Sequence, residues 1–211
     1  MTTTSQNSSQ AEALGPVQTI RKIVLLLALM VLGVLFIFGA SRWSKPVCDA
    51  IDWVGVVLMA ICIVGRTWCA LYIGGRKTYD LVVLGPYSVS RNPLYVFSIL
   101  GAVGVGAQLG AVTPAIAAGL FAWLVFAMVV TREERLLLAA HGDVYRSYLV
   151  RVPRFWPRWA LWNDVELLEV RPRLVATTFA DAIIFLAAVP IAEIFEHLQR
   201  ADIIPVLVRL P

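Results

Sequence analysis

Residues 93–131 read PLYVFSILGAVGVGAQLGAVTPAIAAGLFAWLVFAMVVT, and this stretch decides the fold. It contains two apolar runs, 93–110 and 113–131, each of the length that crosses a hydrocarbon core of roughly 30 Å. Only a few residues around Gly110 and Pro114 separate the runs, so the two helices must be antiparallel and in contact. The stretch therefore predicts an all-α, polytopic membrane protein.

The composition of the whole chain supports this class. Of its 211 residues, 59% are hydrophobic and 15% are charged, and the mean hydropathy is +0.77. Soluble domains carry about 25% charged residues. Further apolar runs at 23–40, 53–74 and 174–195 bring the expected number of transmembrane helices to about five.

Three regions are expected along the chain. Residues 1–20 would form a disordered N-terminal tail, because the first fourteen, MTTTSQNSSQAEAL, are polar and of low complexity. Residues 21–160 would form the membrane-embedded core, and residues 161–211 a linker and a C-terminal transmembrane helix. A cleaved signal peptide is the competing interpretation of 23–40. That run is longer than a typical signal sequence and lacks a clear cleavage site, which favours a retained helix.

The distribution of basic residues predicts the orientation. Thirteen of the 18 lysines and arginines lie before the first apolar run (residues 1–22), in the 75–92 loop and in the 132–173 segment. Because cytoplasmic loops carry an excess of basic residues, these three regions are expected in the cytoplasm, with a bacterial inner membrane as the location. The net charge of +4 is then a consequence of topology. It gives no reason to expect a nucleic-acid partner.

Neither a metal site nor a nucleotide loop is predicted. The three cysteines show no CxxC spacing, and the only two histidines, His141 and His197, lie in different segments. The glycine-rich run 101–110 resembles a phosphate-binding loop but lies inside an apolar span with no strand before it. Small residues four apart, such as Gly106 and Gly110, instead favour close packing of helices.

Polar side chains gather toward the predicted cytoplasmic face. Arg66 lies about two turns inside the second span, roughly 12 Å from its end at 1.5 Å per residue. An arginine there snorkels, pairs with an acid or lines a polar cavity. Glu133 and Glu134 follow the fourth span and point about 100° apart on a helix, so only one of them is expected to face a site. A solvated helix end is the alternative interpretation of this pair.

A second helical segment is expected after Gly142, which ends the preceding helix. Tyr145, Tyr148 and Arg151 recur at steps of three and are expected on one face, with Pro153 stopping the helix. An interfacial anchor of aromatic and basic residues is the competing interpretation.

Taken in order, three stretches resemble the isoprenylcysteine carboxyl methyltransferase family and its phospholipid methyltransferase relatives: GRTWCALYIGG, GPYSVSRNPLYVFSILGAVGVGAQ and TREERLLLAAHGDVYRSYLVRVPRFWP. That family is marked by G-x-Y-x-x-x-R-H-P-x-Y, an apolar hairpin, E-E-x-x-L and G-x-x-Y-x-x-Y-x-x-x-V-P. The resemblance covers about residues 65–157. It implies an integral-membrane methyltransferase that uses S-adenosylmethionine and binds it through a cytoplasmic segment toward the C-terminus.

Carried over position by position, the resemblance implies cofactor-binding roles for Asn92, Pro93, Tyr95, Glu133, Glu134, Tyr145, Tyr148, Arg151 and Arg154. Arg66, Arg91 and Glu134 are the expected catalytic residues, with the two arginines holding an anionic acceptor. Asn92 stands where many family members have histidine. An amide donates and accepts hydrogen bonds but does not take up or release a proton near neutral pH. Asn92 would therefore replace a histidine that only forms hydrogen bonds, and not one that titrates.

The residue types suit methyl transfer, an in-line displacement that needs alignment and a dry site. A sulfonium favours aromatic faces such as those of Tyr95 or Tyr145, and the cofactor's carboxylate suits Arg151 or Arg154. The acceptor is expected to be lipid-like, either an isoprenylated carboxylate or a phospholipid amine, drawn from the membrane. A small thiol or hydrophobic metabolite is the second interpretation, and a non-catalytic membrane protein that keeps the fold is the third. The oligomeric state is not predicted.

Overall fold

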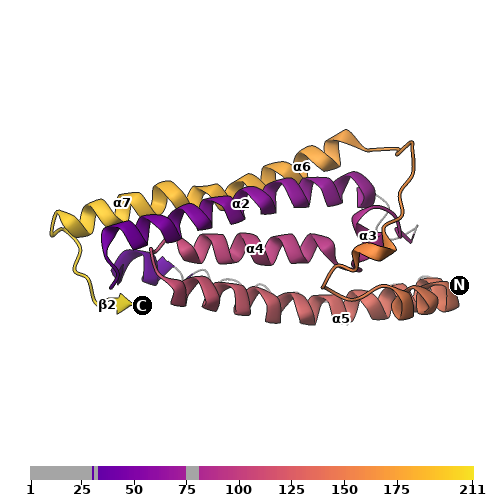
Figure 1. Cartoon of the computed structure of the whole chain (residues 1–211), viewed down its shortest axis with the longest axis horizontal. Coiled ribbons are helices and arrows are strands. Elements are labelled where there is room, and N and C mark those ends of the chain that lie inside the picture. Colours follow the sequence, from indigo (N-terminus) through magenta and orange to yellow (C-terminus); the bar gives the residue numbers. More distant parts are fainter. Residues whose placement is uncertain (1–29, 31–32, 75–80) are drawn as a thin grey trace, which may run out of the picture.

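The computed structural model describes Met30, residues 33–74 and residues 81–211 (Figure 1). The elements follow the chain in the order β1 (Gly39–Ser41), α2 (Lys45–Ile73), α3 (Pro86–Val89), α4 (Pro93–Ala107), α5 (Val112–Arg151), η1 (Trp159–Leu161), α6 (Pro172–Ile183), η2 (Ile184–Ala187), α7 (Ala188–Arg200) and β2 (Val208–Leu210). The predicted tail and half of the predicted first span, 23–40, lie outside the described residues.

Three helical stretches among the described residues are long and apolar enough to cross a membrane: 45–73, 112–151 and 172–200. The last consists of α6, η2 and α7 in succession. The apolar helix α4 has 15 residues, a length of about 22 Å at 1.5 Å per residue. The helical fold and the membrane class are therefore confirmed, while the count of five spans stays a prediction.

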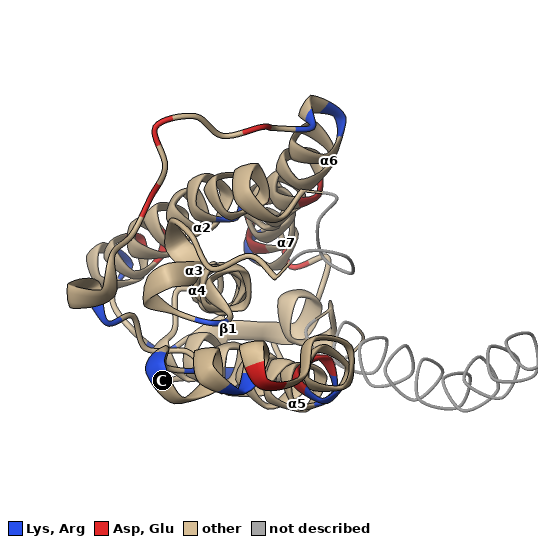
Figure 2. Ribbon diagram, turned by 90° about the vertical axis from the view of Figure 1, so that its right-hand side faces the viewer, with Lys and Arg blue, Asp and Glu red and all other residues tan. Residues whose placement is uncertain are grey.

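The helix α4 lies between α2 and α5 (Figures 1 and 2). Residues 108–111 join α4 to α5, which is the antiparallel hairpin that the sequence predicts. The turn depends on Gly110, whose φ of +62° is the left-handed conformation that favours glycine. The Gly110 amide donates to the Asp52 carboxylate at 3.0 Å, and Ser41 donates to the Gly110 carbonyl at 2.7 Å. These bonds fasten the hairpin to the start of α2.

Glycines allow α4 to approach both of its neighbours. A Cβ atom added to Gly104 would lie 2.6 Å from the Gly55 carbonyl oxygen of α2. One added to Gly106 would lie 2.4 Å from the Pro114 carbonyl oxygen of α5. The prediction that the glycine-rich run packs helices together is confirmed, because these distances leave no room for a side chain.

Two further features shape the ends of the bundle. Helix α5 is kinked at Gly142, which has φ +54° and ψ −127°, and helical structure resumes up to Arg151. The helix end predicted at Gly142 is therefore a kink. At the other end, β1 and β2 pair in parallel, with Ala40 opposite Arg209. This small sheet lies at the end of the bundle away from α3 (Figure 1).

Replacing Gly104 with alanine tests the contact between α2 and α4. The new methyl group forces the two backbones apart, so we expect a lower melting temperature in detergent and a loss of about 1–3 kcal/mol of folding free energy. The matched control is Gly33→Ala, because nothing lies within 4 Å of a Cβ added at Gly33. Equal melting temperatures for the two variants would contradict the close approach.

Candidate functional site

The site is built on the turn that leads from α3 into α4. Gly85 opens the turn with φ +55°, and an added Cβ would lie 2.3 Å from the ring of Tyr72. Asn92 immediately precedes α4, and Pro93 is its first residue. Proline is favoured there because the first amide of a helix has no partner within the helix. The polar residues Arg91 and Asn92 are thereby held at the entrance to an apolar helix.

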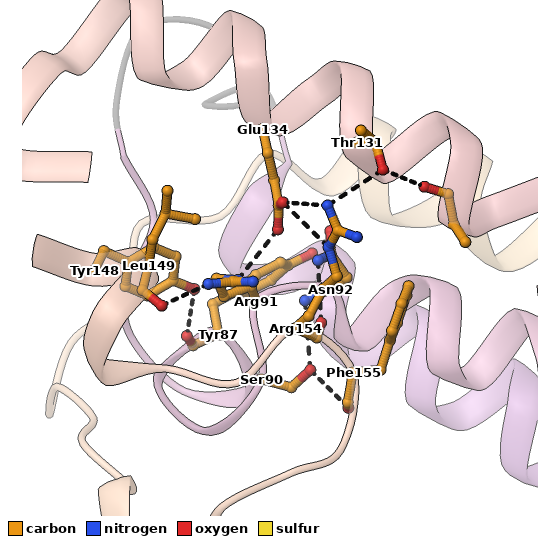
Figure 3. A network of polar contacts seen from close by, with 11 residues as sticks. Tyr87, Ser90, Arg91, Asn92, Thr131, Glu134, Tyr148, Leu149, Arg154 and Phe155 are labelled. Carbon is orange, nitrogen blue, oxygen red and sulfur yellow. Dashed lines mark hydrogen bonds and ion pairs between the residues drawn. The ribbon is translucent and has the colours of Figure 1, made fainter. Parts of the chain in front are cut away.

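A second segment, residues 152–158, follows α5 and hydrogen-bonds along this turn. The Arg91 amide donates to the Pro153 carbonyl at 2.9 Å, and the Arg158 amide donates to the Val89 carbonyl at 2.9 Å. The side chains of the turn add two bonds: Ser90 donates to the Phe155 carbonyl at 3.0 Å and Asn92 to the Arg154 carbonyl at 3.1 Å. Two sequence motifs some sixty residues apart therefore form one unit (Figure 3).

Glu134 of α5 joins this unit to the helix through two arginines (Figure 3). Arg154 donates to Glu134 Oε2 from Nε at 3.1 Å and from its terminal nitrogen at 2.5 Å. These hydrogen bonds raise the pKa of Arg154. Arg91 Nε lies 3.2 Å from Glu134 Oε1, in ionic contact but off the hydrogen-bond direction. Arg91 also donates to the Leu149 carbonyl at 2.6 Å.

Glu133 takes a different partner, since Tyr95 of α4 donates to Glu133 Oε1 at 2.9 Å. The Tyr95 ring packs on Phe126, with the ring centroids 4.8 Å apart. The prediction that only one of the adjacent carboxylates would face the site was wrong. They do point to different partners, as their helical separation requires, yet both line the same pocket.

The pocket lies between α5, the end of α2 and the turn before α4. Among the described residues, its polar lining comes from Arg91, Asn92, Glu133 and Glu134, and its aromatic lining from Tyr87, Tyr145 and Tyr148. The remaining lining is aliphatic, from Ile73, Leu81, Val82 and Leu137. The pocket lining thus combines charged and aliphatic residues at the end of a membrane helix bundle.

The tyrosines of the pocket support one another. Tyr145 and Tyr148 are buried, with ring centroids 5.9 Å apart. Tyr148 donates its hydroxyl to the Tyr87 carbonyl at 2.7 Å, which fixes the α3 turn against α5. Tyr87 has no assigned role in the sequence analysis, although it occupies the tyrosine position of G-x-Y in the family motif. The tyrosine of that motif was therefore the feature of the sequence that could have identified Tyr87 as a site residue.

Other predicted site residues lie outside the pocket lining. Arg151 lines a neighbouring pocket with Val83 and Ser88. The expectation of one face for Tyr145, Tyr148 and Arg151 was wrong, because two steps of three residues turn a helix by 600°, which leaves Arg151 about 120° away from Tyr145. The other predicted residues outside the lining are Pro93, Tyr95 and Arg154, which position its members, and Arg66, which lies deeper along α2.

Arg66 has no carboxylate partner among the described residues. It donates to the Ser98 hydroxyl of α4, while its buried Nε atom has no hydrogen-bond partner in the described part of the chain. Ser98 in turn donates to the Leu94 carbonyl at 2.8 Å. Within 33–74 and 81–211, no group of three or more His, Cys, Asp or Glu side chains is placed to hold a metal ion.

Fold and site together define a helical membrane protein with a charged, tyrosine-lined pocket at one end of the bundle. The phospholipid methyltransferase family matches residues 50–143, which include the turn, the hairpin and the paired glutamates. The chain belongs to this family of methyltransferases, as the resemblance to the isoprenylcysteine enzymes indicates.

Three individual relatives also match this chain. The cobalt-zinc-cadmium resistance protein CzcN of Cupriavidus metallidurans is 34% identical over 175 residues, which is 82% of this chain and 81% of the relative. The nickel-cobalt-cadmium resistance protein NccN of Alcaligenes xylosoxydans xylosoxydans is 35% identical over 176 residues, 83% and 82% of the two chains. Protein-S-isoprenylcysteine O-methyltransferase of Schizosaccharomyces pombe is 34% identical over 78 residues, 37% and 33% of the two chains. No solved structure matches the chain.

Replacing Glu134 with alanine tests whether this carboxylate holds the site together. The change leaves Arg91 and Arg154 side by side without their common partner, and breaking a buried ion pair costs about 3–5 kcal/mol. Because the Glu134 side chain keeps 14% exposure, we expect a loss near the lower end of that range. Thermal unfolding in detergent measures it, with Glu166→Ala at an exposed position as the control. An unchanged melting temperature for Glu134→Ala would show that the bridge is unimportant.

Proposed function

We propose that this protein transfers a methyl group from S-adenosylmethionine to a hydrophobic acceptor that carries an anionic group. The observation that carries the proposal is the pocket itself, in which paired charges and tyrosines meet at the end of apolar helices. Membership of the phospholipid methyltransferase family supports the reaction type. We place the site at the cytoplasmic face of a bacterial inner membrane, where a water-soluble cofactor and a membrane-dissolved acceptor can both reach it.

The donor set of the pocket fits the cofactor. S-adenosylmethionine supplies an electrophilic methyl group on a positively charged sulfur. The rings of Tyr145 and Tyr148 offer the aromatic faces that a cation favours, and Glu133 is an acceptor for hydroxyl or ammonium groups. Arg91 is the guanidinium that lines the pocket, so it is better placed than Arg151 to hold the cofactor's carboxylate.

The chain's own residues then act by holding the reacting groups in position. Glu134 holds Arg91 in the wall of the pocket, and Asn92 is fixed by its bond to the Arg154 carbonyl. A methyl transfer between two aligned groups needs no covalent intermediate, and rigid placement supplies most of what it requires. The aliphatic lining keeps water from competing with the acceptor.

The surroundings of Arg66 are the reason to propose an acceptor that carries a negative charge. It is a cation inside a membrane helix, and a charge there is costly unless it is paired or serves a function. Its visible partner is the neutral Ser98 hydroxyl, and its Nε atom has none among the described residues. A carboxylate or phosphate on a membrane-dissolved acceptor would supply the missing partner.

The chemistry of the pocket favours a carboxylate over an amine as the methyl-accepting group. An ionised carboxylate needs no base, whereas an ammonium group must first lose a proton. Asn92 cannot take that proton, Glu134 is paired with two arginines, and Glu133 already accepts a hydrogen bond from Tyr95. A phospholipid amine or a small thiol is therefore the second candidate for the acceptor.

The names of the bacterial relatives supply a physiological setting for the proposal. They are named for resistance to cobalt, zinc, cadmium and nickel. We propose that methylation of a membrane component by this chain serves the same process. A non-catalytic role in that process is the competing candidate, which Asn92 in place of the family's histidine favours.

Calorimetric titration of the detergent-purified protein with S-adenosylmethionine tests the cofactor site. We expect saturable binding that Asn92→Ala weakens roughly tenfold, because a hydrogen bond in the pocket wall is worth about 1 kcal/mol or somewhat more. Arg151→Ala is the control, since Arg151 lines the neighbouring pocket. Absence of binding to folded wild-type protein would refute the proposal, and equal weakening by both variants would refute this location for the site.

Replacing Arg66 with glutamine tests the acceptor part of the proposal. The guanidinium is lost but a side chain that hydrogen-bonds Ser98 remains, so cofactor affinity should stay within about twofold of wild type. Turnover of an anionic lipid-like acceptor should fall through a higher KM, since a charge-assisted bond contributes about 1.5–3 kcal/mol. A change confined to cofactor affinity would contradict the assignment of Arg66 to the acceptor.

A further inference from the structure

One hydroxyl group of the pocket lining is buried without a hydrogen-bond partner among the described residues. Tyr87 is buried, with 5% of its surface exposed, and its side chain lines the pocket. Its hydroxyl has no hydrogen-bond partner among residues 33–74 and 81–211. Buried hydroxyl groups nearly always have a partner, so an exception inside a pocket needs an explanation.

The neighbouring polar groups of the pocket do have partners. The Tyr95 hydroxyl donates to Glu133, and the Tyr148 hydroxyl donates to the Tyr87 main chain. Asn92 donates to the Arg154 carbonyl. Two other buried side-chain atoms of the pocket lining, Arg91 Nε and Glu134 Oε1, also lack a hydrogen bond in the described part of the chain, but they are in ionic contact with each other at 3.2 Å. The Tyr87 hydroxyl has neither kind of partner there.

The side chain of Tyr87 is also held in place. Its ring belongs to a buried cluster with Cys69 and Tyr72, which are both residues of α2. Its main chain is fixed by the hydrogen bond from Tyr148 and by the left-handed turn at Gly85. The hydroxyl therefore cannot easily swing out to water. Burial raises the pKa of Tyr87 well above its ordinary value, so the phenol keeps its proton at neutral pH and is a hydrogen-bond donor.

We propose that the Tyr87 hydroxyl donates a hydrogen bond to an acceptor atom of S-adenosylmethionine bound in this pocket, and that Tyr87 is a positioning residue of the site. The inference rests on the proposed function. It assigns the unpaired buried hydroxyl of the pocket lining to the ligand, in a pocket that Arg91 and Glu134 also line. The protein leaves a buried donor unpaired because the ligand pairs it, which exchanges some stability of the ligand-free protein for affinity.

Replacing Tyr87 with phenylalanine removes only the hydroxyl and tests this assignment by two readouts. The dissociation constant for S-adenosylmethionine, measured by calorimetry, should rise about three- to tenfold, the range of a single neutral hydrogen bond. The melting temperature of the ligand-free protein should stay the same or rise, because an unsatisfied buried hydroxyl has been removed.

Tyr72→Phe is the matched control. Tyr72 belongs to the same cluster but its hydroxyl donates to Asp164 at 2.8 Å. This control should lower the melting temperature and leave the dissociation constant unchanged. If wild-type protein binds S-adenosylmethionine and Tyr87→Phe binds it as tightly, the Tyr87 inference alone is overturned. The same holds if the melting temperature of Tyr87→Phe falls as that of Tyr72→Phe does. Wild-type protein that binds no S-adenosylmethionine would overturn the inference together with the proposed function.

Discussion

The Glu134 carboxylate holds together three parts of the chain that the sequence separates. It lies on α5, accepts two hydrogen bonds from Arg154 in the segment after that helix, and is in ionic contact with Arg91 in the turn before α4. Two guanidinium groups would repel each other without it. Main-chain hydrogen bonds also join the turn to the 152–158 segment, and side-chain bonds from Ser90 and Asn92 to that segment are seen in Figure 3. The bridge thereby holds Arg91 and Glu134 in the lining of the pocket.

The membrane helices determine where that bridge can form. Glycines at the contacts of α4 bring α2 and α5 close to it, so the end of α2, the turn and the paired glutamates meet at one end of the bundle. At the opposite end the β1–β2 sheet and the Asp52–Gly110 hydrogen bond hold the hairpin. The architecture therefore combines a firmly packed apolar centre with a polar site at its margin, as a reaction between a soluble cofactor and a membrane-dissolved acceptor requires.

Much of this arrangement is predictable from the sequence. Apolar length and a short connection predict the hairpin at residues 108–111, and proline after Asn92 predicts the start of α4, because these are local effects. The β1–β2 sheet was not predicted, since three-residue strands far apart in the chain leave no periodic pattern. Tyr145, Tyr148 and Arg151 were expected on one face, but Arg151 lines a neighbouring pocket, because steps of three drift around a helix. Tyr87 was missed because an unsatisfied hydroxyl is a property of packing, which no spacing reveals.

The most direct test of the account follows a labelled methyl group. Membranes that contain the protein are incubated with S-adenosylmethionine labelled in its methyl group, and the organic-soluble fraction is then extracted and treated with mild alkali. The account predicts label in that fraction that requires the protein and that alkali releases as methanol, as expected for a methyl ester. Label resistant to alkali would move the acceptor to an amine or a thiol. No label beyond that in membranes lacking the protein would contradict methyl transfer to a hydrophobic acceptor.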